Sequence, residues 1–379
     1  MLYLEPYDAG SHAAFTRILT GGLEADWTVL TLPGRHWKWR MRGAAAWLAL
    51  ERARELRGPF DVVLASACLP LAELVGLVPA LATVPRLLYF HENQLAFPVR
   101  AEFAGERDLH FGVTQLVSVL AADRCAFNSA WNRDSFLVAA RELLARMPDA
   151  VPAGWLERLA ERSVVLPLPV ELPDHPGVAG RDVPAGPGRA PGPLILWNHR
   201  WEHDKGPEAF FGALARLADR GVPFRAAVCG ERFREAPAVF DEARARLGAR
   251  LQHFGFVEDR HAYLDLLARA QLVVSTARHE FFGLAVLEAV QLGARPLVPD
   301  GLCYPELYPA EFRYAGEAAL AAELERLCRG WTAGTLELRA DRRALTAPFA
   351  APRVLPRYAA LLTELAGGAV PLAPGPAPR

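Results

Sequence analysis

The sequence contains only two lysines, Lys38 and Lys205, among 42 basic residues, and its formal net charge is −1. This balance excludes a nucleic-acid binder that works through a broadly positive surface, so a phosphate-rich partner must be held by local clusters. The five cysteines include no Cys-x-x-Cys pair and are typical of buried thiols in a reducing cytosol. No basic leader precedes a long apolar stretch, and no segment is clean enough to span a bilayer. We therefore expect a cytoplasmic protein without a membrane anchor.

Several common motifs are also absent. There is no Asp-x-Asp pair, no Gly-x-x-x-x-Gly-Lys loop and no Gly-x-Gly-x-x-Gly turn, which removes the main support for kinases, ATPases and dehydrogenases. His199, Glu202 and His203 match the His-x-x-Glu-His pattern of a zinc peptidase, but that motif needs a helix. Here it follows an expected strand and runs into Asp204-Lys205-Gly206-Pro207, so we predict no metal site.

Short apolar runs alternate with helical patterns on both sides of a segment rich in Pro and Gly, residues 171–193. Strands are expected at 2–4, 28–32, 61–65 and 86–90 before it, and at 194–198, 224–229, 251–254, 272–275 and 296–299 after it. Helices are expected at 11–20, 43–56 and 354–365. This alternation predicts an α/β protein with two doubly wound, mostly parallel sheets, whose ligands lie beyond the carboxyl ends of the strands in a cleft between the domains.

The same reading divides the chain into parts. Residues 1–170 form a first domain, 171–193 a linker and 194–345 a second domain. Residues 346–366 are expected to pack back on the body as a C-terminal helix, and the tail 367–379 is expected to be disordered because Pro and Gly dominate it.

The strongest local signal is the segment 277–293, where Gly283 lies at an expected loop-to-helix junction. Free backbone N–H groups of Phe282, Gly283 and Leu284 would face a phosphate there. Glu280, in the loop, would hold sugar hydroxyls, and Glu288, further along the helix, both hydroxyls of a ribose. The alternative is an ordinary amphipathic helix with both acids in solvent, and this segment alone does not decide between the two.

A second signal follows the first strand after the linker. Arg200 and Lys205 share one strand-to-helix loop, where a guanidinium fork and a point charge together suit a diphosphate. Lysine is the rare cation of this chain, which favours a function at this position.

In the first domain, two loops follow expected strands. Gly10, Ser11 and His12 form a capped turn whose backbone N–H groups suit a phosphate. The other loop is a dense polar run that favours a site over a simple turn, and it consists of His91, Glu92, Asn93 and Gln94.

The segment 34–43 interleaves cations with tryptophans. Such a pattern holds single-stranded RNA, because cations contact phosphates while aromatic planes stack on unpaired bases. The alternative, left open, is a solvated basic face with both tryptophans in the core. The residues concerned are Arg35, His36, Trp37, Lys38, Trp39, Arg40 and Arg42.

Together these segments resemble the family-4 retaining glycosyltransferases of the GT-B fold. In the second domain the resemblance rests on Arg200 with Lys205, on the turn Gly255-Phe256-Val257 and on Glu280 with Glu288. In the first domain, TLPGRHWKWRMR, YFHENQLAFPV and AFNSAWNRDSF resemble segments of the tRNA-queuosine α-mannosyltransferases. The likeness covers most of residues 1–170 and 194–300.

This resemblance implies transfer of mannose from GDP-mannose to the cyclopentene-diol of queuosine in a tRNA anticodon, of the tRNA-Asp type, with retention of configuration and without a metal or other cofactor. Arg200 and Lys205 would neutralise the diphosphate, with Phe256 and Val257 near the base. Glu280 would bind the mannose, Glu288 the ribose, and His91 would lie near the anomeric carbon. The family's first loop usually has glycine where this chain has Ala9, which leaves the contacts from Gly10 and Ser11 open if that position needs a positive φ.

Two other functions remain open at this stage. The first is a GT-B enzyme acting on a lipid or a small glycan, since fold does not fix substrate. The second is a non-catalytic RNA-binding module, against which the complete set of donor residues argues. We expect a nucleotide sugar and a queuosine-containing tRNA as partners, with no membrane and no obligate protein partner.

Overall fold

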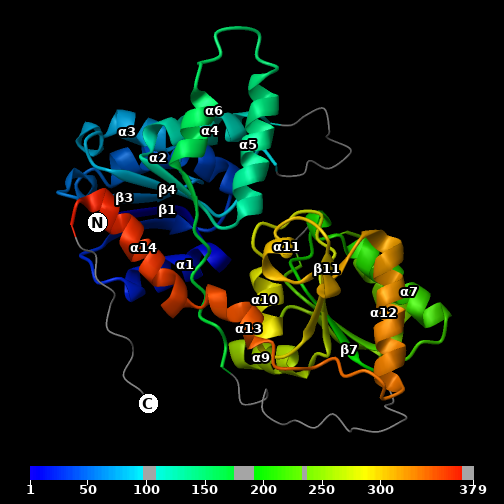
Figure 1. The fold of residues 1–379 in the computed structure, drawn as a ribbon. Helices are drawn as coiled ribbons and strands as arrows, with labels where there is room; N and C mark the ends of the chain where they lie inside the picture. The colour runs from blue at the N-terminus through cyan, green and yellow to red at the C-terminus, as the bar shows by residue number, and fades with distance from the viewer. Residues whose placement is uncertain (97–107, 175–191, 233–236, 369–379) are drawn as a thin grey trace. The chain divides into compact units, whose positions relative to one another are not determined.

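The computed structural model describes residues 1–96, 108–174, 192–232 and 237–368. It divides into two compact units (Figure 1). Unit 1 comprises Met1–Glu171 together with Phe349–Arg379, and unit 2 comprises Leu172–Pro348.

Unit 1 contains a six-stranded parallel sheet in the order β2-β1-β3-β4-β5-β6. In Figure 1, α1 and α14 lie on one side of this sheet, and α2, α3 and α4 lie on the other. The strands are β1 (Leu2–Asp8), β2 (Thr28–Pro33), β3 (Val63–Ser66), β4 (Arg86–Phe90), β5 (Arg124–Phe127) and β6 (Ser163–Val165). The helices are α1 (Gly10–Gly22), α2 (Trp37–Glu51), α3 (Leu71–Leu77), α4 (His110–Ala121), α5 (Ala130–Leu144), α6 (Trp155–Arg162) and α14 (Ala351–Ala366), with short 3-10 turns η1 (Glu55–Arg57) and η2 (Pro79–Leu81).

Unit 2 repeats the architecture with the sheet order β12-β11-β10-β7-β8-β9, again parallel throughout. The strands are β7 (Leu194–Asn198), β8 (Arg225–Cys229), β9 (Leu251–Gly255), β10 (Leu272–Val274), β11 (Arg295–Pro299) and β12 (Arg313–Tyr314). The helices are α7 (Pro207–Asp219), α8 (Val239–Leu247), α9 (Arg260–Arg269), α10 (Leu284–Gln291), α11 (Tyr304–Leu307), α12 (Gly316–Thr332) and α13 (Arg343–Thr346), with 3-10 turns η5 (His203–Lys205), η6 (Gly248–Arg250), η7 (Ala310–Phe312) and η8 (Ala347–Phe349).

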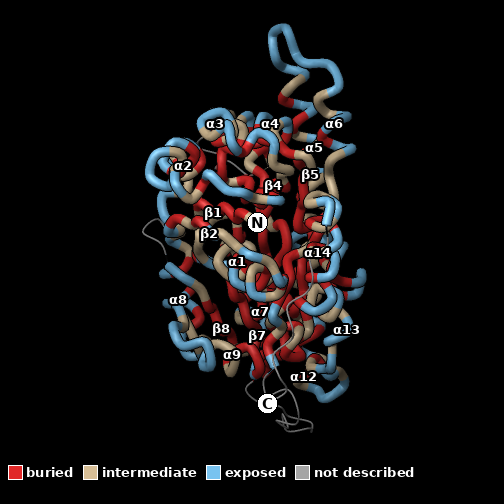
Figure 2. The backbone as a smooth tube through the Cα atoms, turned by 90° about the vertical axis from the view of Figure 1, so that its left-hand side faces the viewer, coloured by how far each residue is buried: buried red, intermediate tan, exposed pale blue. Residues whose placement is uncertain are grey.

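The central strands are apolar on both faces because helices cover both faces. All five residues of β7 are buried, and Figure 2 shows the strands as the buried centre of each unit. Each sheet has one topological switch point, where the chain stops adding strands toward one edge of the sheet and starts adding them toward the other. In unit 1 it lies between β1 and β3, and in unit 2 between β7 and β10. Open parallel sheets bind ligands in the crevice at this switch point.

The predicted fold class, an α/β protein with two doubly wound parallel sheets, is confirmed. Every expected strand is present within about two residues of its predicted bounds, except that β1 continues to Asp8. Three short strands, β5, β6 and β12, were not predicted. Helix α2 begins at Trp37, six residues before the predicted start at 43, because its mixture of Trp and Arg hides the helical period.

The last helix completes unit 1. Val170 pairs with Ala350 in an isolated parallel bridge, and the hydroxyl of the buried Tyr358 donates to the Pro167 carbonyl at 3.0 Å. The Tyr358 ring packs against Phe15 with ring centroids 5.6 Å apart. Most of the predicted linker and tail lie outside the described residues. Within the described ranges, no helix is long and apolar enough to cross a membrane.

Candidate active site

The predicted donor residues of unit 2 gather at its switch point. Arg200 and Lys205 follow β7, and Glu280 follows β10, which pairs directly with β7. Glu288 lies on α10, the helix that follows β10. The strand order therefore brings together side chains that are up to 88 residues apart in the sequence.

Lys205 is buried and surrounded by oxygen atoms. Its Nζ lies 3.0 Å from Asp204 Oδ2 and 3.4 Å from Glu280 Oε2, and it donates to the His279 carbonyl at 3.0 Å. Burial works to lower the pKa of Lys205, but Glu280 and Asp204 outweigh it and raise the pKa above its ordinary value. Lys205 is therefore a fixed positive charge whose position is set by two carboxylates. Asp204 was not predicted as a site residue.

Glu280 is the negative counterpart of Lys205. Burial works to raise the pKa of its carboxyl, but Lys205, His199 and His279, with a backbone hydrogen bond from Phe282, lower the pKa to about 2. The N–H of Phe281 also donates to Glu280 Oε1 at 3.2 Å. The carboxylate is thus ionised throughout the physiological pH range and can accept hydrogen bonds from hydroxyl groups.

The buried ring of His199 borders this charge pair. Burial, and then the charge of Lys205, lower the pKa of His199 to about 4, so the ring is neutral at pH 7. Nε2 of His199 is buried and has no hydrogen-bond partner among the described residues. A neutral, buried imidazole adds no positive charge to the site.

His199 makes the stability of unit 2 depend on pH. In the unfolded chain its pKa returns to about 6.5, so its contribution is fully present above about pH 6.5 and is lost as pH falls toward the folded value of about 4. We expect His199→Asn to lose stability less steeply than the unaltered protein over this interval in urea unfolding. His261→Asn, on the exposed start of α9, should keep the original slope. An unchanged slope in His199→Asn would refute this account.

Gly206 fixes the loop that carries Lys205. Its φ is +61°, and an added Cβ would lie 2.2 Å from the carbonyl oxygen of Thr276. The Thr276 hydroxyl donates to the Lys205 carbonyl at 2.9 Å and accepts from Trp197 Nε1 at 3.1 Å. The loop after β7 is therefore held directly against the segment after β10, and only glycine fits at position 206.

Glu288 belongs to a second polar cluster. Arg260 donates to its Oε1 at 2.5 Å, and the Tyr263 hydroxyl donates to its Oε2 at 3.2 Å. Asn198, the last residue of β7, donates to Tyr263 Oη at 3.2 Å and to the Ala285 carbonyl at 2.7 Å. The alternative of two acids in free solvent is wrong for both Glu280 and Glu288, since each is held by partners. Arg260 and Tyr263 were not predicted.

The start of α10 differs in one detail from the prediction. Gly283 is the N-cap with φ +78°, and Leu284 is the first helical residue, so Glu288 lies about one turn into the helix. A Cβ on Gly283 would come 3.2 Å from the Tyr304 ring. The backbone N–H of Phe282 is not free as predicted, because it supports the Glu280 carboxylate.

The remaining predicted donor residues lie nearer the surface. Arg200 is about half exposed and pairs with Glu202 at 3.1 Å. Phe256 is 61% exposed directly after β9, next to the partly buried Val257. An exposed ring of this size suits contact with a flat ligand. The segment 199–203 contains no α-helical turn, so His199 and His203 do not share a helix face as a zinc peptidase requires.

In unit 1, the first predicted loop joins β1 to α1. Ala9 has φ −152°, an extended conformation open to any residue, whereas Gly10 has φ +52°. Alanine in place of the family's usual glycine therefore introduces no strain. Ser11 is exposed, and His12 lies in the first turn of α1, where its Nδ1 is 3.0 Å from Glu5 Oε2. His91, at the end of β4, stacks on His12 with ring centroids 3.9 Å apart.

The polar run after β4 divides between structure and surface. Asn93 is fully buried and donates to the Asn132 carbonyl, to Asn132 Oδ1 and to Ser135 Oγ at 3.0–3.1 Å. The amide of Gln94 is held by Glu92 at 3.0 Å. The structure therefore gives Asn93 a role in fixing the loop on α5, not the substrate contact that the sequence suggested.

The Trp-rich segment forms the start of α2 and lines an open pocket of about 420 Å³. Trp39 is 64% exposed, which argues against the alternative in which both tryptophans belong to the core. Trp37 packs on Phe111 with ring centroids 5.1 Å apart, and His36 has the unusual positive φ of 54°. The lining residues, hereafter the tryptophan platform, are His36, Trp37, Lys38, Trp39 and Arg42. The exposed Arg35 and the partly buried Arg40 flank it.

Comparison with known proteins agrees with these observations. Residues 1–170 match the tRNA-queuosine alpha-mannosyltransferase N-terminal domain, and residues 187–314 match the glycosyl transferases group 1 family. The chain is 38% identical over 337 residues to the tRNA-queuosine alpha-mannosyltransferase of Drosophila melanogaster, covering 87% of both chains. The chain belongs to the tRNA-queuosine alpha-mannosyltransferase family. It is therefore a glycosyltransferase, as predicted.

Another curated relative aligns over a shorter stretch, and solved structures are similar in fold alone. A GDP-mannose-dependent phosphatidylinositol dimannoside mannosyltransferase of Mycobacterium tuberculosis is 32% identical over 118 residues, 31% of this chain and 30% of that protein. Anabaena HepE in complex with UDP superposes with a TM-score of 0.65 at 16% identity, covering 96% of this chain and 99% of that one. Sucrose-phosphate synthase of Thermosynechococcus elongatus gives 0.68 at 15% identity, covering 96% and 98%. These structures share the GT-B fold with tRNA-queuosine mannosyltransferases.

Proposed function

We propose that this protein transfers mannose from GDP-mannose to the cyclopentene-diol of queuosine in the anticodon of a tRNA, with retention of configuration. The observation that carries the proposal is the match of the whole of unit 1 up to residue 170 to the family's N-terminal domain, together with 38% identity to the Drosophila enzyme. The proposal places the reaction in the cytoplasm, where tRNA is available.

The charge pair of unit 2 suits the donor. Lys205 supplies a fixed positive charge for the diphosphate leaving group, and the exposed Arg200 adds a fork donor. Glu280 is ionised and can accept bonds from sugar hydroxyls, and we assign the ribose to Glu288, whose carboxylate is held by Arg260 and Tyr263. Catalysis by such a set is electrostatic, because fixed charges stabilise the charge that develops as the sugar leaves its phosphate.

We propose that no metal is required, so treatment with EDTA should leave turnover unchanged.

Transfer is tested with labelled GDP-mannose and two samples of one tRNA, with and without queuosine at the wobble position. We expect label only on the queuosine-containing sample. Label on neither tRNA would contradict the proposal, and label recovered in added phosphatidylinositol vesicles instead would identify a lipid acceptor.

The tryptophan platform suits the tRNA. Trp39→Ala removes the most exposed ring of α2 and should weaken tRNA binding by roughly 5- to 150-fold, the equivalent of one base stacked on an aromatic ring. Trp47→Ala is the matched control, because Trp47 is a second exposed tryptophan of α2, 39% exposed, outside the platform. Filter binding measures both. Equal losses in the two variants would show that the platform does not hold RNA.

A further inference from the structure

Glu5 is a buried acid that none of the roles above uses. It lies in β1 with 0% exposure, just before a bulge between Glu5 and Asp8. The N–H of Tyr7 donates to its Oε1 at 2.9 Å. Among the described residues its ion-pair partners are two histidines, His12 and His91, and no lysine or arginine. A buried carboxylate that stays ionised needs a compensating positive charge, and the only groups paired with it among the described residues that can carry one are the two imidazoles.

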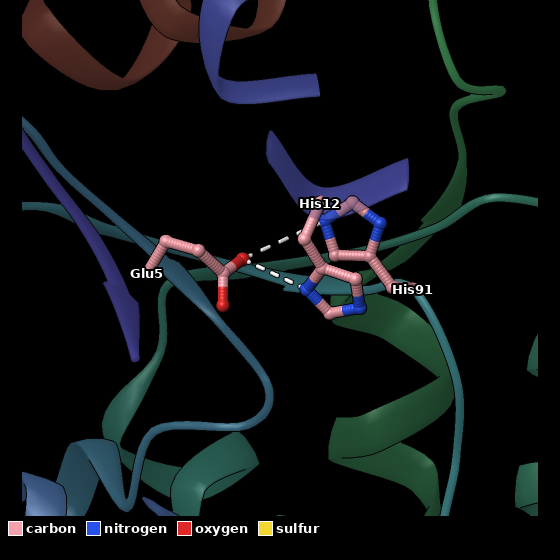
Figure 3. A group of neighbouring side chains, drawn as sticks. All are labelled: Glu5, His12 and His91. Atoms are coloured by element: carbon pink, nitrogen blue, oxygen red, sulfur yellow. Dashed lines mark hydrogen bonds and ion pairs between the residues drawn. The ribbon is translucent and has the colours of Figure 1, made fainter. Parts of the chain in front are cut away.

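His12 is the histidine in contact with Glu5. Its Nδ1 lies 3.0 Å from Glu5 Oε2, as the lower dashed line of Figure 3 shows. Its side chain is 13% exposed, and its Nε2 makes no hydrogen bond to a described residue. One side of the ring is therefore fixed by the acid, and the other is directed outward at the switch point of unit 1.

His91 limits how much positive charge the pair can carry. Its ring stacks on His12 at 3.9 Å with an interplanar angle of 27°, and its Nε2 is 3.8 Å from Glu5. Two stacked imidazolium rings would repel each other, so a single proton is favoured. Burial, and then the charge of His12, lower the pKa of His91 well below its ordinary value.

The neighbouring carboxylates favour a charge on His12 over one on His91. Burial works to lower the pKa of His12, but Glu5, with smaller contributions from Glu92 and Asp8, raises it above the ordinary value. The Tyr7 ring lies against His12 with centroids 5.8 Å apart. Other titratable groups facing this cluster include Tyr3, Tyr89 and Cys68, and burial raises the pKa of each of these three. Because a phenol or a thiol becomes an anion when it ionises, these raised pKa values keep all three groups neutral at pH 7, and they add no negative charge beside His12.

The cluster suits a proton better than a metal ion. Glu5, His12 and His91 have ligand atoms within 4.8 Å of one another, alone among the described residues in this respect. However, the lone pair of an imidazole nitrogen lies in the plane of its ring. Because the His12 and His91 rings are stacked, their lone pairs lie in two nearly parallel planes. They do not converge on one point as tetrahedral coordination requires.

We propose that Glu5 is a positioning residue that keeps His12 doubly protonated, so that its outward Nε2–H is a charged hydrogen-bond donor to a phosphate group of the substrate. The inference rests on the proposed function, whose two substrates both carry phosphate: the nucleotide sugar and the tRNA backbone. The neutral His91 ring supports His12 from behind. This arrangement resembles a carboxylate that orients a histidine through one nitrogen while the other meets the substrate.

The test replaces the charge but keeps the shape of the acid. In Glu5→Gln, NMR titration of the folded protein should show the pKa of His12 lowered by about 1 to 3 units, the range expected for loss of a charge partner. Binding of GDP-mannose, and separately of tRNA, is measured by calorimetry across pH. For the substrate that meets His12, we expect affinity to fall about 10- to 100-fold at pH 7 and to recover as the pH is lowered to 5.5, where His12 gains its proton again.

Two variants serve as references. Asp8→Asn removes a carboxylate that contributes less than Glu5 to the raised pKa of His12, so it should shift the His12 titration less than Glu5→Gln does. His12→Gln should bind weakly at every pH, without recovery on acidification. A purely structural role for Glu5 would weaken binding equally at both pH values.

Recovery with GDP-mannose alone identifies the diphosphate as the ligand, and recovery with tRNA alone identifies its backbone; either supports the proposal. An unchanged His12 pKa in Glu5→Gln, a shifted pKa with no change in either affinity, or stoichiometric zinc whose removal abolishes binding would overturn it. These readouts need no mannose transfer. They therefore remain decisive even if labelled GDP-mannose gives no product and the proposed function fails.

Discussion

Lys205→Met is expected to reduce kcat by about 10² to 10³, the usual cost of removing one preorganised group that stabilises developing charge. The same substitution should lower the free energy of unfolding by about 3–5 kcal/mol, because it leaves Asp204 and Glu280 buried without their cation. Steady-state kinetics with GDP-mannose and urea unfolding measure the two effects separately.

A double substitution separates catalysis from stability. Lys205→Met with Glu280→Gln removes one charge of each sign, so much of the lost stability should return while turnover stays low. Arg220→Ala is the control for loss of a cation in unit 2, since Arg220 is an exposed residue paired with Glu325 and should leave both measurements nearly unchanged. If kcat of Lys205→Met stayed near that of the unaltered enzyme, the role given to Lys205 would be wrong.

Gly206→Ala should be strongly destabilising for its size. The new methyl would lie 2.2 Å from the Thr276 carbonyl oxygen, at a backbone φ of +61° that alanine tolerates poorly. We expect a loss of about 3 kcal/mol in the free energy of unfolding, and a fall in kcat because the adjacent Lys205 must shift.

Gly212→Ala is the matched control for this substitution. Gly212 is an exposed residue of α7 with no heavy atom within 4 Å of an added Cβ, so alanine should stabilise the helix by about 0.5–1 kcal/mol. Urea unfolding of both variants checks the pair. The two variants should change the free energy of unfolding in opposite directions, so a loss of stability in both would contradict the explanation.

Much of the fold could be predicted from short apolar runs. Runs such as Leu194–Asn198 are buried on both faces of a parallel sheet, and a continuous run of this kind is visible without any tertiary information. The strand ends in turn indicated Arg200, Lys205 and Glu280, because parallel sheets collect ligands at that edge. The short strand β12 has only two residues, too few to show a pattern.

The partners of these residues could not be predicted in the same way. Arg260 reaches Glu288 across 28 positions, and in a chain whose cations are nearly all arginine nothing marks that one. The burial of Asn93 depends on Asn132 of α5, a contact formed only when the helix packs on the sheet. Glu5 is one of two acids in a largely apolar strand, and its pairing with His12 depends on how α1 turns back over β1.

The return of α14 to unit 1 has a consequence for how the protein is made. Tyr358 and Val354 are fully buried in unit 1, yet they leave the ribosome after the whole of unit 2. Unit 2 can therefore fold during synthesis as soon as its own chain has emerged, whereas unit 1 waits for the last helix with Phe15 and Tyr89 uncovered. A chain truncated before residue 351 would lack α14. Unit 1 could not complete its core, although its residues 1–171 would all be present.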